Sequence, residues 1–152
     1  EALIGSDFLV LNGDVIFSDL DLDKLIHAHK RADSVATIVL AKSRTPTRFG
    51  AAEVDSSNKV LSFIEKPRKQ IVGEAWVNAG VYVIRPAVLA KIPKGRRMSL
   101  ESDIIPKLVR DGTISAYKHE GYWADVGTPE DYLRVQRDLL TGVFRPQEAT
   151  TA

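Results

Sequence analysis

The first forty residues alternate apolar runs with a helix pattern, and this order constrains the fold more than any other feature. Residues 8–17 read FLVLNGDVIF, an apolar stretch interrupted by Asn12-Gly13-Asp14. Taken alone, this stretch also fits a hairpin, because Asn-Gly favours a type I′ turn. However, apolar residues recur at helical spacing over 22–32, and the β-branched run 34–40 follows. A strand, a helix and a second apolar strand predict a βαβ unit with parallel strands.

The middle of the chain continues the α/β pattern. Two alternating runs separated by turn residues predict a hairpin of strands 51–55 and 59–65. An apolar strand is predicted at 76–84, and Pro86 opens a short helix. A further helix is predicted over 99–112, from a serine cap to a glycine stop.

The last helix pattern is the clearest one. It follows two short predicted strands at 114–118 and 122–126, begins at the N-cap Thr128 and ends at Gly142. The predicted inner stripe of this helix consists of Tyr132, Val135 and Leu139. The small and polar residues 143–152 are predicted to be a disordered tail.

Composition excludes several classes of protein. The chain has 152 residues, the size of one domain with a real core, and a formal net charge of +1, which does not favour binding to nucleic acid or to an anionic membrane. It has no cysteine, hence no disulfide framework and no thiolate nucleophile, which is typical of a cytoplasmic protein. No apolar run approaches the ~20 residues that span a bilayer.

Two carboxylates occupy similar places in the predicted fold. Asp14 follows the first apolar strand, and Asp125 ends a strand just before the last helix. The carboxyl ends of strands in an open α/β sheet form the ligand crevice, so the pair could hold one Mg²⁺ together with substrate phosphates. Either residue alone is better explained as an ordinary turn or loop aspartate.

Two further motifs place polar residues at strand positions. Glu65 and Lys66 end a strand at Pro67, which stops the ladder, so both side chains could reach the crevice. A carboxylate suits sugar hydroxyls, and an ammonium suits a phosphate. Asn78 and Gly80 interrupt an otherwise apolar strand, where glycine often marks the close approach of a ligand. A solvated strand end remains the alternative for these residues.

Five motifs in order resemble the sugar-1-phosphate nucleotidyltransferase family, and most closely its mannose-1-phosphate guanylyltransferase group. They are Asn12-Gly13-Asp14, Phe49-Gly50, Glu65-Lys66-Pro67, Asn78-Ala79-Gly80-Val81-Tyr82 and the run YWADVGTP at 122–129. The resemblance implies a Rossmann-like α/β fold with a mixed, mostly parallel sheet. It also implies transfer of a nucleotidyl group from a nucleoside triphosphate to a sugar 1-phosphate, with release of pyrophosphate.

The resemblance also assigns roles to residues at the matching positions. Asp14 and Asp125 match Mg²⁺ ligands, and Lys66 matches the lysine that holds the sugar phosphate; these three are the candidate catalytic residues. Glu65 and Asn78 match residues that bind sugar hydroxyls. The remaining substrate-binding positions, where the backbone meets the sugar, are Gly50 and Gly80.

One signature of the family has no match in this chain. The glycine-rich loop that cradles the triphosphate is absent, and no G-x-G occurs anywhere. Residues 1–142 are therefore expected to be the C-terminal, sugar- and metal-binding part of a catalytic domain. The chain is expected to be a proteolytic product, a partial structure or one of two chains, and to be inactive alone. The full-length protein is expected to be a homo-oligomer.

The substrates and the class of function stay open at this point. GTP with mannose 1-phosphate is the first choice, and UTP or dTTP with glucose 1-phosphate is the alternative. A non-catalytic regulatory subunit that binds nucleotide sugars is the rival from another class. The absence of G-x-G-x-x-G argues against a dinucleotide-dependent oxidoreductase. In every case the partners are small molecules rather than a nucleic acid polymer or a membrane.

Overall fold

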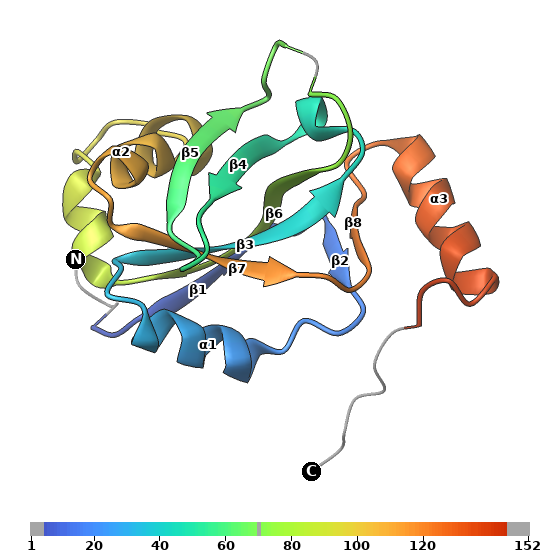
Figure 1. Cartoon of the computed structure of the whole chain (residues 1–152), viewed down its shortest axis with the longest axis horizontal. Helices are drawn as coiled ribbons and strands as arrows, with labels where there is room; N and C mark the ends of the chain where they lie inside the picture. The colour runs from blue at the N-terminus through green and yellow to red at the C-terminus, as the bar shows by residue number, and fades with distance from the viewer. Residues whose placement is uncertain (1–4, 70, 146–152) are drawn as a thin grey trace.

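A computed structural model describes residues 5–69 and 71–145 and contains a six-stranded sheet (Figure 1). The strand order is β5, β4, β6, β3, β7, and β1 pairs with β6 beside this path. A separate two-stranded ribbon pairs β2 with β8. The strands are β1 (Phe8–Leu11), β2 (Val15–Phe17), β3 (Ala36–Ser43), β4 (Gly50–Val54), β5 (Val60–Glu65), β6 (Ala75–Ile84), β7 (Ile114–His119) and β8 (Trp123–Asp125).

The sheet is mixed, which confirms the predicted fold class. β3 and β7 pair in parallel, whereas β6 is antiparallel to β1, β3 and β4, and β5 is antiparallel to β4. Consequently β1, β3, β4 and β7 run in one direction, and β5 and β6 run in the other. The strands of the predicted βαβ unit, β1 and β3, do run parallel, but β6 lies between them. The Asn-Gly turn does not form a hairpin, because β1 pairs with β6 and β2 pairs with β8.

The helices lie close to their predicted positions. They are α1 (Leu22–Arg31), α2 (Ile105–Arg110), α3 (Pro129–Leu140), the 3₁₀ helices η1 (Pro46–Arg48) and η2 (Pro86–Lys91), and the π-helical turn η3 (Leu100–Ile104). Asp21 caps α1 by accepting a hydrogen bond from the Lys24 N–H at 2.9 Å. None of the described helices is long and apolar enough to cross a membrane.

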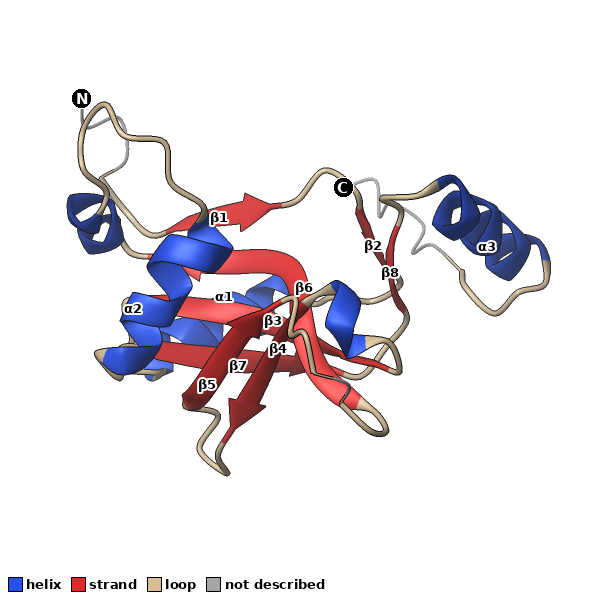
Figure 2. Ribbon diagram, turned by 90° about the horizontal axis from the view of Figure 1, so that it is seen from above, coloured by secondary structure: helices blue, strands red, loops and turns tan. Residues whose placement is uncertain are grey.

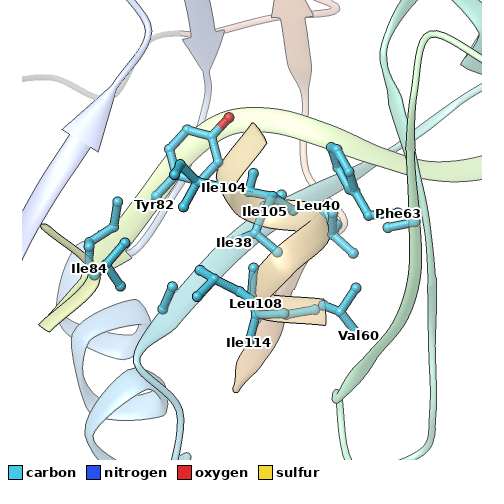
Figure 3. Close-up of a cluster of buried hydrophobic side chains, with 14 residues drawn as sticks. Ile38, Leu40, Val60, Phe63, Tyr82, Ile84, Ile104, Ile105, Leu108 and Ile114 are labelled. Carbon is cyan, nitrogen blue, oxygen red and sulfur yellow. The ribbon is translucent and has the colours of Figure 1, made fainter. Parts of the chain in front are cut away.

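The core covers both faces of the sheet. Because side chains alternate along a strand, Ile38 and Leu40 of β3 face one side, and Val39 and Ala41 face the other. The first side packs against α2 through Leu108 and its neighbours (Figure 3), and the second packs against α1. Burial on both faces explains why the residues of β3 from Ile38 to Ala41 are consecutively apolar rather than alternating.

The helix α3 and the residues that follow it correct two predictions. Of its predicted inner stripe, Val135 is 7% exposed, but Tyr132 and Leu139 are 57% and 46% exposed. The reason is that α3 lies at the periphery beside β8 (Figure 2), so only one narrow side of it meets the fold. Phe144 was predicted to belong to a disordered tail, yet it is 7% exposed and stacks on Tyr122 with ring centroids 4.8 Å apart. The rest of that predicted tail, 146–152, lies outside the described residues.

Candidate active site

A cavity of about 600 Å³ gathers most of the predicted site residues from distant parts of the chain. Its walls come from the ends of β4, β5 and β8, from the middle of β6 and from the turns beside these strands. Its lining includes Gly50, Glu65, Lys66, Asn78, Gly80 and Asp125. Asp14, the seventh predicted residue, does not line this cavity.

Glu65 and Lys66 both reach the cavity although they are neighbours in sequence. Consecutive side chains of a strand normally point to opposite faces, but Lys66 has a φ of 45°, in the left-handed region. Its N–H donates to the Phe49 carbonyl at 3.0 Å, which holds the chain in this turn. A non-glycine residue in this conformation costs on the order of 1–3 kcal/mol and often occurs where function requires it.

Gly50 makes room for the Glu65 side chain. A Cβ at this position would lie 2.2 Å from Phe63 Cζ and 2.7 Å from Glu65 Oε2. The Glu65 Oε2 atom is buried, and it has no hydrogen-bond partner among the described residues. Burial raises the pKa of Glu65, the nearby Glu101 raises it further, and Lys66 partly opposes this. An unpartnered carboxylate oxygen in a cavity wall is suited to accept a hydrogen bond from a ligand hydroxyl.

Gly80 lies in a bulge of β6 that places Asn78 at the cavity. The β3–β6 register shifts between the pairs Ile38–Tyr82 and Leu40–Asn78, so that β6 has extra residues over this stretch. Gly80 has a φ of 78°, and a Cβ there would lie 2.9 Å from Asn12 Nδ2. The bulge thus needs glycine for its conformation and for space.

Asp14 and Asp125 are brought together by the β2–β8 ribbon. Val15 is the cross-strand partner of Asp125, and the Val126 N–H donates to the Asp14 carbonyl at 2.8 Å. Asp125 lines the cavity, whereas Asp14 is exposed beside it. No cluster of three or more histidine, aspartate or glutamate side chains suited to a metal occurs among the described residues. Two carboxylates still fit Mg²⁺, a hard cation that keeps several waters and binds substrate phosphates.

The cavity residues that were not predicted from the sequence include Arg48, Ser99 and Glu101. Arg48 precedes the Phe49-Gly50 motif directly, and this adjacency is the only signal that could have indicated it. Glu101 lies in the turn η3, where an acidic residue near a helix start also has an ordinary capping explanation.

Arg48 links the cavity to the start of α3. Its Nη1 donates to Asp131 Oδ1 at 3.1 Å, and its Nη2 donates to Asp131 Oδ2 and lies 4.0 Å from Asp125 Oδ1. Asp131 is 4% exposed and also accepts from Thr128 and Arg134. The hydrogen bonds from Arg48 are the main cause that lowers the pKa of Asp131 well below its ordinary value.

Replacing Arg48 with methionine is expected to destabilise the fold by about 1–2 kcal/mol at pH 7, because Asp131 loses its bidentate partner. The effect is no larger because Arg48 is partly exposed to solvent, which weakens the ion pair. Since the folded-state pKa of Asp131 is lowered, this stabilisation is present above the ordinary aspartate pKa of about 4 and is lost at lower pH. Urea denaturation at pH 7 and at about pH 3 measures both effects. Arg44→Met, at an exposed position in the same loop, is the control. A difference that grows on acidification would contradict this account.

Residues 2–142 match the family model described as nucleotidyl transferase. The chain therefore belongs to the nucleotidyl transferase family. It is 36% identical over 137 residues to a mannose-1-phosphate guanylyltransferase of Mycobacterium tuberculosis, covering 89% of this chain and 37% of the relative. It is 34% identical over 145 residues to the bifunctional protein GlmU of Methanococcus maripaludis, covering 93% of this chain and 34% of the relative.

A solved structure shares the fold. HddC from Yersinia pseudotuberculosis, complexed with GMP-PN, aligns with a TM-score of 0.70 and 29% sequence identity. The alignment covers 88% of this chain and 56% of HddC. The chain spans 37% of the length of the Mycobacterium tuberculosis relative and 34% of the length of the Methanococcus maripaludis relative.

Proposed function

We propose that this chain forms the sugar-phosphate- and metal-binding part of an enzyme that makes a nucleotide sugar. The proposed substrates are GTP and mannose 1-phosphate, and the products are GDP-mannose and pyrophosphate. The observation that carries the proposal is that Glu65, Lys66, Asn78 and Asp125, which come from three separate segments of the chain, line one cavity. The Mycobacterium tuberculosis relative, named as a mannose-1-phosphate guanylyltransferase, supports the choice of base and sugar.

The cavity offers complementary groups for each part of a sugar 1-phosphate. Its volume of about 600 Å³ lies within the usual range for small-molecule sites. The ammonium of Lys66 would hold the phosphate, because a compact cation suits a dianion. The unpartnered Oε2 of Glu65 and the amide of Asn78 would bind hydroxyl groups of the ring.

The proposed reaction requires the protein mainly to align the reactants and to neutralise charge. A phosphate oxygen of the sugar 1-phosphate attacks the α-phosphorus of the triphosphate, and the bond to the pyrophosphate oxygen breaks. The second pKa of a phosphate monoester is about 6, so the nucleophile is already ionised near pH 7 and no general base is required. Lys66 then aligns the nucleophile. Asp14 and Asp125 would hold a Mg²⁺ ion, which neutralises charge on phosphate oxygens when bound.

Equilibrium binding to the 152-residue chain tests the proposal. Mannose 1-phosphate is expected to bind at least about tenfold more tightly than free mannose, because the phosphate adds a charge-assisted contact. Isothermal titration calorimetry in Mg²⁺ measures this difference, and glucose 1-phosphate is the matched competitor. Tighter binding of glucose 1-phosphate would favour the alternative sugar. Equal affinity for mannose and its 1-phosphate would contradict the proposed site.

A further inference from the structure

A chain of hydrogen bonds runs through the cavity wall from Glu101 to Asn78, with the buried Tyr82 between them. The Tyr82 hydroxyl donates to Glu101 Oε1 at 3.1 Å and accepts from Asn78 Nδ2 at 2.6 Å. The Ser99 hydroxyl donates to Glu101 Oε2 at 2.9 Å, and the Gly80 N–H donates to Asn78 Oδ1 at 3.0 Å. We name these side chains, Ser99, Glu101, Tyr82 and Asn78, the Glu101 relay.

The position of Tyr82 makes this relay rigid. Tyr82 is 2% exposed and lies in the cluster of α2-facing core residues, with its hydroxyl oxygen at the edge of that cluster (Figure 3). A buried phenol must find hydrogen-bond partners, and here both come from the relay. Burial raises the pKa of Tyr82, so the hydroxyl keeps its single proton.

Glu101 at one end of the relay and the Gly80 N–H at the other end set the direction of its hydrogen bonds. A carboxylate only accepts, so the Tyr82 proton points to Glu101 and the Tyr82 oxygen must accept from its other neighbour. Asn78 must therefore present its NH₂ group to Tyr82 and its oxygen to the Gly80 N–H. A flipped amide would set oxygen against oxygen at Tyr82 and N–H against N–H at Gly80.

The fixed orientation of the Asn78 amide determines which of its donors and acceptors remain for a ligand. An asparagine amide has two N–H donors and two acceptor lone pairs, and the relay uses one of each. Asn78 lines the cavity and is 9% exposed, so one N–H and one lone pair remain for a ligand. A hydroxyl group, which both donates and accepts, complements this pair.

We propose that Glu101 is a positioning residue for the sugar, because through Tyr82 it fixes the orientation in which Asn78 meets one ring hydroxyl. This inference rests on the proposed function, since it needs a sugar in the cavity. It adds Glu101, Tyr82 and Ser99 to the groups that determine affinity for the sugar, although Tyr82 does not line the cavity itself.

Four variants of the 152-residue chain, titrated with mannose 1-phosphate, test the inference. Glu101→Ala and Tyr82→Phe are each expected to weaken binding about tenfold, because each interrupts the relay at a different hydrogen bond. Glu101→Gln is expected to stay within about threefold of wild type, because its amide oxygen still accepts from Tyr82. The double variant Tyr82→Phe with Glu101→Ala is expected to bind no more weakly than either single variant, because both changes interrupt one path.

Inorganic phosphate serves as the control ligand in the same samples. It has no ring hydroxyl, so its affinity is expected to be unchanged in all variants, which also shows that they are folded. Additive losses in the double variant would overturn the inference, as would wild-type affinity in Glu101→Ala or equal losses in Glu101→Ala and Glu101→Gln. If wild-type chain binds phosphate but gains nothing from the sugar, the proposed function fails together with this inference. If it binds the sugar and the variants do too, only this inference fails.

Discussion

Asp125→Asn is expected to abolish the effect of Mg²⁺ on the binding of GDP-mannose, the proposed product. In the wild-type chain, Asp14 and Asp125 would hold Mg²⁺, which would neutralise charge on the pyrophosphate of the nucleotide sugar. Asparagine keeps the shape of the side chain but removes its charge. Loss of a group that only supports a metal ligand typically lowers metal affinity or activity by 10–100-fold. Loss of the ligand itself should therefore lower the Mg²⁺-dependent affinity by roughly 100-fold or more.

Calorimetric titration of GDP-mannose with Mg²⁺ and with EDTA measures this effect. Asp14→Asn is expected to behave like Asp125→Asn, and in both variants the affinity with Mg²⁺ should equal the affinity with EDTA. Asp33→Asn, which removes an exposed carboxylate after α1, is the matched control and should keep the wild-type difference. A Mg²⁺ effect of wild-type size in either site variant would refute the metal assignment.

Lys66→Ala is expected to weaken the binding of mannose 1-phosphate by about 10–150-fold. A hydrogen bond between charged groups contributes on the order of 1.5–3 kcal/mol, and Lys66 is the proposed phosphate ligand. The affinity for free mannose should change little, because the hydroxyl-binding groups Glu65 and Asn78 remain.

The control for this prediction is Lys30→Ala, which removes an exposed ammonium from α1. Both variants lose one positive charge, so a general electrostatic effect would weaken binding equally in both. Such equal losses, or a Lys66→Ala variant with wild-type affinity, would argue against a phosphate at Lys66.

Local patterns predicted the elements well, because each pattern reports directly on burial. The β-branched run in β3 indicated burial on both faces, and the N-cap Thr128 fixed the start of α3. Pro67 indicated that the ladder stops after Glu65 and that both side chains could reach the crevice, and the positive φ of Lys66 explains how both line the cavity.

The arrangement of these elements was less accessible from the sequence. Nothing in the pattern of a doubly buried strand identifies its neighbours, so the position of β6 between β1 and β3 could not be predicted. The apolar spacing of α3 predicted Tyr132 and Leu139 as inner residues, because spacing describes a face without describing what covers it.

The same limit applies to the candidate site. Arg48 and Asp131 are 83 positions apart in the sequence, and their pairing follows only from the fold. Glu101 belongs to no motif, and it is linked to Asn78 through hydrogen bonds of the Tyr82 hydroxyl, which lies between them. Residues that act through buried contacts leave no local pattern, whereas Asp125 and Lys66 were found because their motifs are contiguous.

The central position of β6 in the sheet determines when its part of the candidate site unfolds. β6 pairs with β1, β3 and β4, and its residues Val77, Ala79 and Val81 are fully buried. Asn78 and Gly80 therefore cannot detach without opening the sheet. Amide hydrogens of β6 should exchange with solvent at the rate of global unfolding, and those of the peripheral α3 should exchange sooner. Asn78 and Gly80 should thus stay in place until the whole domain unfolds cooperatively.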